Sequence, residues 1–375
     1  MKVETFEMER FQSVWENRVA HNLSESGVHP MSLEELLLPA ERDELLKQRL
    51  AYVQTNGSPA LREGIARLYP GATADNLVVG NGTAEANYVV IWHLVEPGDE
   101  VVMMLPNYMQ IWGVVRGQGA TVVPWRLREE RGWSPDLDEL KDLVTPRTRL
   151  IAVCNPNNPT GSILSEEAMR GIVEIAQRHG TWILSDEVYR GAELDGKESP
   201  SFWGRYDRVL VACGLSKAYG LPGLRIGWVT GPAPTIAELW ARKDYLSIAP
   251  GALSDHLAQK AVSAAVRPRI LARTRGIVNG NLPVLQAWMR DQGSGFRLVP
   301  PRAGGIAYAR YSWPINSTRL MERLRDEQSV LVVPGDQFGM DGFLRIGLGN
   351  EPADLKAGLE RIGRVLSSLG SAPGS

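Results

Sequence analysis

Between residues 76 and 230 the chain repeats short apolar runs that end in turn residues. Within most runs Val, Ile and Leu follow one another instead of alternating with polar residues. This pattern is typical of strands buried on both faces of a largely parallel sheet. The runs predict seven strands, at 76–80, 100–105, 120–125, 149–154, 181–185, 208–212 and 224–230.

Helix-like stretches lie between these runs, for example at 84–95 and 165–178. The second stretch has clear ends, with Ser165 as a candidate N-cap and Gly180 as a candidate stop. Strands that alternate with helices in this way predict an α/β layer fold.

The pattern changes after about residue 275. A helix-like stretch at 275–291 is followed by short apolar runs at 306–311, 330–333 and 343–347, and then by a final helix-like stretch at 352–369. This order predicts a smaller α+β unit at the C-terminal end.

Composition narrows the class of protein. The chain has 375 residues, of which 43% are hydrophobic and 22% charged, as in ordinary globular proteins. A net charge of −2 gives no basic field for nucleic acid. Cys154 and Cys213 lie in apolar runs and the five histidines lack metal-ligand spacing, so we expect neither a disulfide framework nor a metal site.

The N-terminal residues are charged, and no apolar run approaches the ~20 residues that span a bilayer. We therefore expect no signal peptide, no membrane partner and a cytoplasmic protein.

A lysine in a tight turn is the first candidate for chemistry. Lys217 follows the run at 208–212 and a Gly-Leu-Ser turn, in an otherwise small and apolar sequence setting. A desolvated lysine can form a Schiff base with a carbonyl, and Arg225, further along the same segment, has the planar fork that suits a phosphate. A surface lysine and an arginine in an ion pair would account for the same two residues.

A carboxylate ends another predicted strand. Asp186 follows the run at 181–185, at the carboxyl edge where ligands bind in open α/β sheets. A carboxylate there can keep the nitrogen of a heterocyclic cofactor protonated, and Tyr189 can face the same ligand. Capping of the following turn is the more common fate of a lone Asp.

Two turns complete the set of candidates. NPNNPTG, residues 155–161, follows the run at 149–154 and brings Asn158 to the same edge of the sheet. GNGTAE, residues 80–85, joins a strand to a helix, and backbone N–H groups at a helix N-terminus form an anion cradle. Each segment would serve equally well as a plain turn.

In combination, NPNNPTG, SDEVY, SKAYGLPGLRIG and FLRIG resemble the motifs of fold type I pyridoxal-phosphate (PLP) enzymes, most closely the class I/II aminotransferases. The resemblance runs from about residue 52 to residue 345. It implies a large domain at 46–275, with a mostly parallel seven-stranded sheet between helices, and a smaller α+β C-terminal domain at 276–375. Residues 1–45 would form an N-terminal segment that packs near the small domain and the active site.

The resemblance also implies roles for the candidate residues. Lys217 would bond PLP and move the substrate proton, Asp186 would pair with the pyridine nitrogen, and Tyr189 would hydrogen-bond the ring O3′. The other cofactor contacts that it implies are Asn158 at O3′, the stacked ring of Tyr108, the phosphate loop Gly82, Thr83 and Ala84, the phosphate arginine Arg225, and Ser216. For Tyr108, a place in the core or at an interface stays open.

Two further residues concern the substrate and the assembly. Arg345, in FLRIG, matches the arginine that clamps the substrate α-carboxylate, and Asn158 would bind the substrate as well as the cofactor. Tyr52 matches the tyrosine that reaches the phosphate of the neighbouring subunit, which implies a homodimer with composite active sites.

The sequence departs from the family pattern at two places. Many relatives have a hydroxyl residue where this chain has Gly214, so that one phosphate contact is missing or supplied by Ser216.

The segment LSESGVHP is similar to the start of capreomycidine-synthase-like enzymes, which are PLP enzymes that eliminate and cyclise arginine derivatives. In this segment Gly27 and Val28 would line the substrate pocket. Glu25 could meet a cationic side chain, although a solvated loop carboxylate is the commoner case.

We therefore expect a PLP-dependent aminotransferase that moves an amino group between an L-amino acid and a 2-oxo acid. The alternative is a PLP enzyme that eliminates, cyclises or oxidises an arginine-type amino acid, because the motifs define the cofactor and not the reaction. A non-enzymatic sensor domain is a third interpretation, and the presence of both Lys217 and Asp186 argues against it. For Arg302 and Arg310 we expect an exposed or paired arginine in place of a second carboxylate site.

Overall fold

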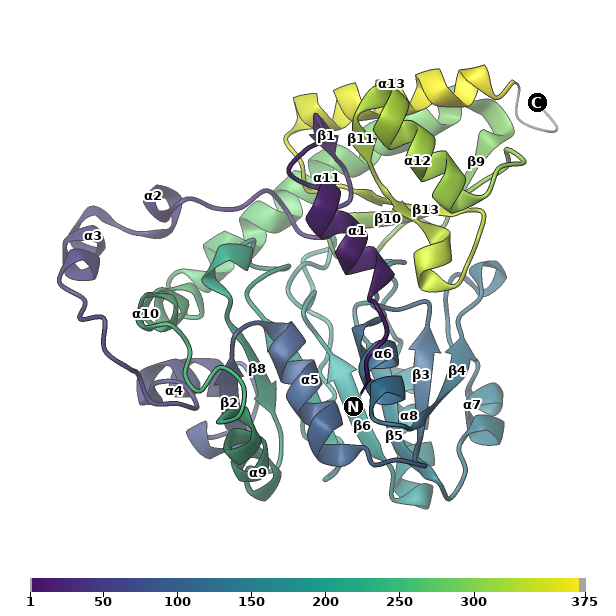
Figure 1. Cartoon of the computed structure of the whole chain (residues 1–375). Coiled ribbons are helices and arrows are strands. Elements are labelled where there is room, and N and C mark those ends of the chain that lie inside the picture. Colours follow the sequence, from purple (N-terminus) through teal and green to yellow (C-terminus); the bar gives the residue numbers. More distant parts are fainter. Residues whose placement is uncertain (1, 371–375) are drawn as a thin grey trace.

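Seven strands form the central sheet of the structure, a computed structural model that describes residues 2–370 (Figure 1). They are β2 (Leu77–Gly80), β3 (Glu100–Leu105), β4 (Thr121–Arg126), β5 (Thr148–Cys154), β6 (Trp182–Asp186), β7 (Val209–Gly214) and β8 (Gly227–Thr230). Their order across the sheet is β2-β8-β7-β6-β5-β3-β4, and β8 runs antiparallel to both of its neighbours. The predicted mostly parallel sheet is confirmed, although a 3₁₀ turn at Pro222–Leu224 delays the start of β8.

Helices cover both faces of this sheet, as predicted. The helices on one face are α5 (Thr83–Leu94), α6 (Gln110–Gly117) and α9 (Ala233–Lys243). Those on the other side are α4 (Pro59–Ala66), α7 (Leu137–Leu143), α8 (Glu166–His179) and α10 (Ala252–Ala261). In β3, Val101 packs toward the first face and Val102 toward the second. Both faces are therefore buried, which explains why the strand sequences do not alternate.

The ends of α8 follow from its sequence. The Ser165 hydroxyl accepts a hydrogen bond from the Ala168 N–H (3.1 Å), and Gly180 ends the helix in the left-handed conformation at φ 63°. Both predicted helix signals are confirmed.

A smaller unit follows, with the antiparallel sheet β12-β13-β10-β9. Its strands are β9 (Phe296–Leu298), β10 (Ile306–Tyr311), β12 (Val333–Pro334) and β13 (Phe343–Gly347), and its helices are α11 (Arg267–Asp291), α12 (Ser317–Gln328) and α13 (Pro352–Ser368). The run predicted as one strand at 330–333 is instead two short strands in different sheets, because β11 (Val330–Leu331) pairs with the N-terminal segment and β12 with β13.

Helix α11 connects the two units and begins earlier than the predicted residue 275. Its first turns bury Ile270 and Leu271 in the core of the large unit, whereas Val278 and Leu285 belong to the core of the small one. The predicted domain division at 275–276 therefore falls inside one continuous helix.

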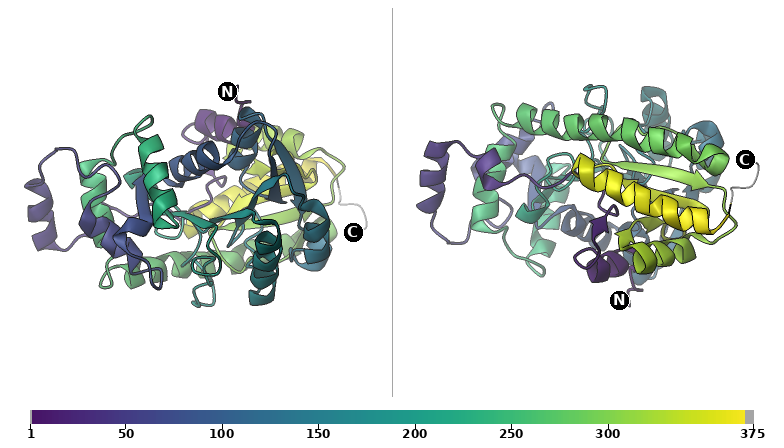
Figure 2. Two further views of the ribbon diagram at one scale, coloured as in Figure 1. Left: turned by 90° about the horizontal axis from the view of Figure 1, so that it is seen from below. Right: turned by 90° about the horizontal axis from the view of Figure 1, so that it is seen from above.

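The N-terminal segment contains α1 (Glu7–Trp15), β1 (His21–Asn22), α2 (Leu33–Leu36) and α3 (Pro39–Leu46). Helix α1 lies between the large and small units in Figure 1, and β1 pairs in parallel with β11 of the small unit. The stretch with α2 and α3 projects from one end of the molecule in both views of Figure 2.

Across residues 2–370, no helix is long and apolar enough to cross a membrane, and no cluster of three or more His, Cys, Asp or Glu side chains could hold a metal ion.

Candidate active site

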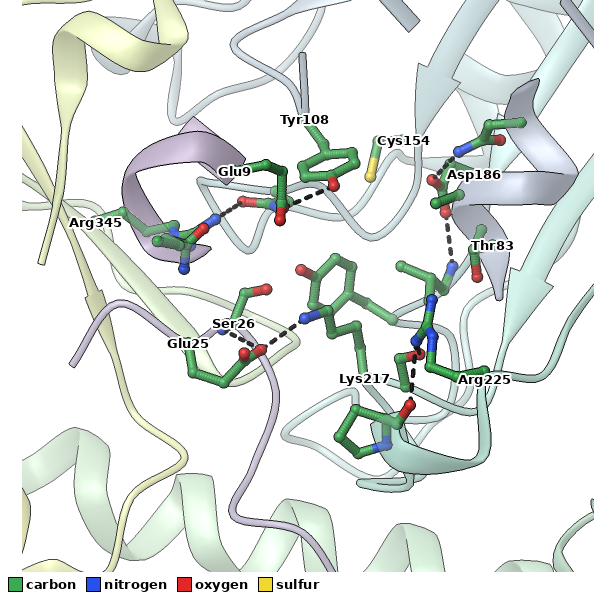
Figure 3. Close-up of a pocket in the computed structure, with 18 of the residues that line it drawn as sticks. Glu9, Glu25, Ser26, Thr83, Tyr108, Cys154, Asp186, Lys217, Arg225 and Arg345 are labelled. Atoms are coloured by element: carbon green, nitrogen blue, oxygen red, sulfur yellow. Dashed lines mark hydrogen bonds and ion pairs between the residues drawn. The ribbon is translucent and has the colours of Figure 1, made fainter. Parts of the chain in front are cut away.

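A cavity of about 300 Å³ lies where the carboxyl ends of β5, β6 and β7 meet α1, α5 and the small unit (Figure 3). Residues from distant parts of the sequence line it. Those that the sequence analysis had selected are Thr83, Ala84, Tyr108, Asn158, Asp186, Tyr189, Ser216, Lys217, Arg225 and Arg345.

Lys217 points into the cavity from the turn after β7, and its nearest polar partner is a carboxylate. Its Nζ lies 2.6 Å from Oε1 of Glu25. The N–H groups of Ser26 and Gly27 donate to the same oxygen at 2.8 and 3.1 Å. The positive charge of Lys217 lowers the pKa of the Glu25 carboxyl to about 2. Lys217 is thus ion-paired, and not in the purely apolar setting that its sequence neighbours predict.

Glu25 is partly solvated, as expected for a loop carboxylate, but it is not a free one, because it is ion-paired with Lys217. The N-terminal segment passes directly over the Ser216–Lys217 turn, where a Cβ on Gly27 would lie 3.6 Å from Cδ of Lys217. This close approach turns Glu25 into the cavity, although 44% of its side-chain surface stays accessible through the cavity opening.

Asp186 lies at the end of β6, buried on the floor of the cavity. Its carboxyl oxygens accept hydrogen bonds from Nδ2 of Asn87 (3.0 Å) and from the N–H of Val188 (3.1 Å). Burial raises the pKa of Asp186, and neither of these donors is a cation. A protonated ring nitrogen would supply the positive charge that favours the ionised form.

Two tyrosines and an amide stand around the same cavity. Burial raises the pKa of the Tyr189 phenol, so the group stays protonated and can donate to a ring oxygen. Asn158 is buried in the turn after β5, where Asn158–Pro159 is a cis peptide bond. The Tyr108 hydroxyl donates to Oε1 of Glu9 at 2.8 Å, and its ring faces the cavity (Figure 3).

An anion cradle forms at the N-terminus of α5. Gly82 is the N-cap at φ 90°, and a Cβ at this position would overlap the guanidinium of Arg225. The Arg225 Nη1 donates to the Pro222 carbonyl at 3.1 Å and contacts the Ser216 hydroxyl at 3.4 Å. The Thr83 hydroxyl oxygen is buried and has no hydrogen-bond partner in the described part of the chain. These groups together suit a phosphate.

Close packing explains the departure at Gly214. A Cβ at this position would lie 2.5 Å from Oγ1 of Thr83 and 2.9 Å from the Ile226 carbonyl oxygen. No hydroxyl side chain fits there without movement of the cradle. Ser216, which lines the cavity, is the nearby hydroxyl that remains.

Arg345 reaches the cavity from β13 and is 2% exposed. Its Nη1 donates to Oδ1 of Asn158 (3.0 Å) and its Nη2 to the Ser24 carbonyl (2.6 Å). Its Nε is buried without a partner among residues 2–370. This free donor at a cavity wall is suited to a carboxylate.

The remaining predicted residues lie at or beyond the edge of the cavity. Gly27 and Val28 are buried in the segment over Lys217. Tyr52 is 87% exposed and does not line the cavity of its own chain. Arg310 is paired with Glu129 at 2.6 Å, as expected for a structural arginine.

Sequence reasoning missed several residues of this site. Asn87 lies one helical turn after Thr83 on α5, so the spacing indicates that it shares the helix face of the cradle, where the structure brings it to Asp186. Glu9, Gln12 and Glu16 share one face of the α1 region at intervals of three and four, and all three line the cavity. A polar helical face of this kind is ordinarily solvated, so its pattern alone does not predict a site.

The residues present fit PLP. The cradle at Gly82–Ala84 and Arg225 suits its phosphate, Asp186 its ring nitrogen, and Lys217 its aldehyde. Bound PLP supplies an electron sink that makes the Cα–H bond of an amino acid acidic. In such a complex, Lys217 Nζ would be placed to take up and return the Cα proton, and Arg345 would be placed to hold the carboxylate.

Known proteins resemble this chain over most of its length. The family model of class I and II aminotransferases matches residues 27–362. Capreomycidine synthase of Streptomyces vinaceus is 33% identical, with 92% of this chain and 90% of the relative covered. Arginine–pyruvate transaminase of Pseudomonas aeruginosa is 32% identical, with 89% and 86% covered. A solved PLP-dependent aminotransferase from Streptococcus suis is 33% identical, with a TM-score of 0.92 and 98% and 99% of the two chains covered. The chain therefore belongs to the class I and II aminotransferases, a family of PLP-dependent enzymes.

Proposed function

We propose that this protein is an aminotransferase that moves an amino group between an L-amino acid and a 2-oxo acid. The observation that carries the proposal is that Arg345 and Lys217 face one cavity. An α-carboxylate held at the free Nε of Arg345 leaves the amino acid Cα on the Lys217 side, where Nζ can move its proton.

The proposal assigns the other residues as follows. Asp186 holds a proton on the ring nitrogen, Tyr189 and Asn158 donate to the ring oxygen, and Tyr108 packs on the ring. Gly82, Thr83, Ala84, Ser216 and Arg225 bind the phosphate, and Gly27 and Val28 border the substrate.

We further propose a homodimer in which Tyr52 contributes to the phosphate site of the other subunit. Support comes from the projecting N-terminal stretch (Figure 2), where Leu46 is 86% exposed and Leu50 79% exposed beside the exposed Tyr52. Apolar side chains this exposed are typical of a surface that another chain covers.

A second candidate is elimination, cyclisation or oxidation of an arginine-type amino acid. The Glu25 carboxylate beside Lys217 favours it, since a second acid–base group can move protons at carbons beyond Cα. The similarity to capreomycidine synthase also favours it.

A single-turnover experiment tests the proposal. PLP-loaded protein is mixed in a stopped-flow spectrometer with single amino acids, including arginine and aspartate, and no oxo acid is added. Aminotransfer predicts that the cofactor converts to its amino form and that a 2-oxo acid reverses the change. Turnover of arginine without formation of the amino form would overturn the proposal in favour of the second candidate.

A further inference from the structure

Once PLP and a substrate α-carboxylate are assigned to residues of the cavity, several carboxylates on its wall have no assigned cation. Arg225 serves the phosphate, Asp186 the ring nitrogen, Lys217 the aldehyde carbon, and Arg345 the substrate carboxylate. The carboxylates that remain on the cavity wall are those of Glu9, Glu16 and Glu25.

Among the described residues, Lys217 at Glu25 is the one ion-pair partner of these three carboxylates, although the charge of Arg345 also acts on Glu9 and Glu25. Glu9 accepts a hydrogen bond from the neutral Tyr108 hydroxyl. The Glu16 carboxylate has neither an ion pair nor a hydrogen bond within the described chain. Glu25 is paired with Lys217, whose nitrogen is the atom that bonds PLP. Carboxylates grouped in a partly enclosed space without a counter-charge favour the entry of a cation.

The position of Glu16 further favours a bound cation. Glu16 is the C-cap of α1, where the partial charge of the helix is negative and disfavours a carboxylate. Burial raises the pKa of Glu16, and the nearby charges of Glu25 and Glu9 raise it further, against a smaller opposite effect of the charge of Lys217. Helix α1 is held in place there, because Nε2 of Gln12 donates to both the carbonyl and the hydroxyl of Ser24 at 3.0 Å.

A second, independent feature indicates that a ligand spans the cavity. Arg345 lines the same cavity and is 2% exposed, and its buried Nε has no hydrogen-bond partner among residues 2–370. One end of the cavity therefore offers a carboxylate-binding donor. In Figure 3, Glu9 and Glu25 flank the space between Arg345 and Lys217, so a substrate bound at both of these residues passes beside the carboxylates.

We propose that Glu9, Glu16 and Glu25 select an L-amino acid whose side chain ends in a cation, a guanidinium or an ammonium group. The proposal rests on the proposed function in one respect, since it takes the substrate α-carboxylate to bind at Arg345. A dicarboxylic amino acid is disfavoured on the same grounds. The basic residues on the cavity wall are Lys217, Arg225 and Arg345, and each already has an assigned partner. The second carboxylate of such a substrate would instead lie near the negative charges of Glu9, Glu16 and Glu25.

Matched ligand pairs test the proposal on the PLP-loaded enzyme. L-Arginine and L-citrulline have nearly the same shape but differ in charge, and so do L-lysine and L-norleucine. The apparent dissociation constant of each comes from the dependence of the cofactor absorbance change on amino acid concentration. We expect the cationic member of each pair to bind at least about tenfold more tightly, as a lost charge-assisted contact predicts.

Glu16→Gln is the variant that isolates the effect, because Glu16 touches neither Lys217 nor Arg345 through a hydrogen bond. We expect it to weaken arginine binding and leave citrulline binding nearly unchanged, so that the ratio of the two constants falls severalfold. Glu7→Gln is the matched control, since Glu7 lies on the same helix but outside this cavity. Cofactor content equal to that of the wild type, and a melting temperature no lower than that of the wild type, would show that each variant is folded.

The outcomes separate this inference from the proposed function. Equal binding of arginine and citrulline, or a ratio that Glu16→Gln leaves unchanged, would overturn the cation selection even if aminotransfer occurs. A retained ratio in a protein that never forms the amino cofactor would overturn only the aminotransferase proposal, because the binding ratio does not depend on the fate of the substrate.

Discussion

The central residue of the site is Lys217, and its replacement gives the most direct test at this scale. Lys217→Ala removes the amine that lines the cavity between Arg345 and the phosphate cradle. We expect PLP to bind at the cradle without a covalent bond, so that the visible band of the bonded cofactor disappears and turnover is lost. An absorbance spectrum and an activity assay measure both, with the exposed Lys197→Ala as control. Turnover retained in Lys217→Ala would refute the assignment.

A second prediction concerns Gly214. Gly214→Ser places a side chain within 2.5 Å of Thr83 Oγ1 and 2.9 Å of a backbone carbonyl. We expect a loss of about 1–3 kcal/mol in unfolding free energy from overpacking, and weaker PLP binding because Thr83 must move. Urea unfolding and a PLP titration measure the two effects. Gly276→Ser is a suitable control, since nothing lies within 4 Å of a Cβ there; gain of affinity in Gly214→Ser would contradict the packing argument.

The ion pair of Glu25 predicts how the stability of the PLP-free protein depends on pH. Its pKa is lowered from 4.5 to about 2 by Lys217, so its ionised form stabilises the folded state. This contribution is complete above about pH 4.5 and is lost as the pH falls toward 2. We therefore expect the wild type to lose more stability than Glu25→Gln between pH 5 and pH 3, as measured by urea unfolding. Parallel losses in the two proteins would mean that the ion pair does not stabilise the fold.

At the residue scale, motifs pointed to the cofactor residues and to Arg345, whereas the polar face of α1 with Glu9, Gln12 and Glu16 was missed. Asp186 and Lys217 follow buried strands, so the sheet edge places them without knowledge of the rest of the chain. Glu25 and Glu16 reach the cavity through the path of the N-terminal segment, which no local pattern encodes. The position of such residues depends on tertiary packing across almost two hundred positions of sequence, as in the pair Glu25–Lys217.

At the scale of elements, α1 combines a structural and an electrostatic role. Its polar face turns toward the cavity, and its C-cap carries a carboxylate at the negative end of the helix. We expect Glu16→Gln to raise the unfolding free energy at pH 7 by about 0.3–1 kcal/mol, because it removes an unfavourable interaction with the helix dipole. Since the folded state raises the pKa of Glu16, the gain should vanish as the pH falls below 4.5. A destabilised Glu16→Gln at pH 7 would show that the carboxylate has a cationic partner in solution.

The elements themselves were predictable to different degrees. Strands buried on both faces, such as β3, can be predicted because their sequences are continuous apolar runs. The division of 330–333 into β11 and β12 was not predictable, because it depends on which distant strand each half pairs with, β1 or β13. The early start of α11 was missed for a similar reason, since its first turns are buried by the large unit and its later turns by the small one.

At the scale of the whole molecule, one chain supplies most of the groups that we propose for the site, but its own Tyr52 lies outside the cavity. A tyrosine that is 87% exposed on a projecting stretch gains a role only if another chain covers it. Light scattering should therefore give the mass of a dimer. A stable, active monomer would contradict the composite site.

Mixing two defective variants tests the composite site more sharply. Lys217→Ala lacks the reactive amine, and Tyr52→Phe lacks the hydroxyl that we assign to the partner's phosphate. In a mixed dimer, the Lys217 of one subunit faces the intact Tyr52 of the other, so one complete site is restored. We expect activity after co-refolding to exceed the sum of the two separate variants, whereas a Tyr52→Phe, Lys217→Ala double variant mixed with Lys217→Ala gives none. If Tyr52 acted within its own chain, no pairing of the two single variants would raise activity above that of Tyr52→Phe alone.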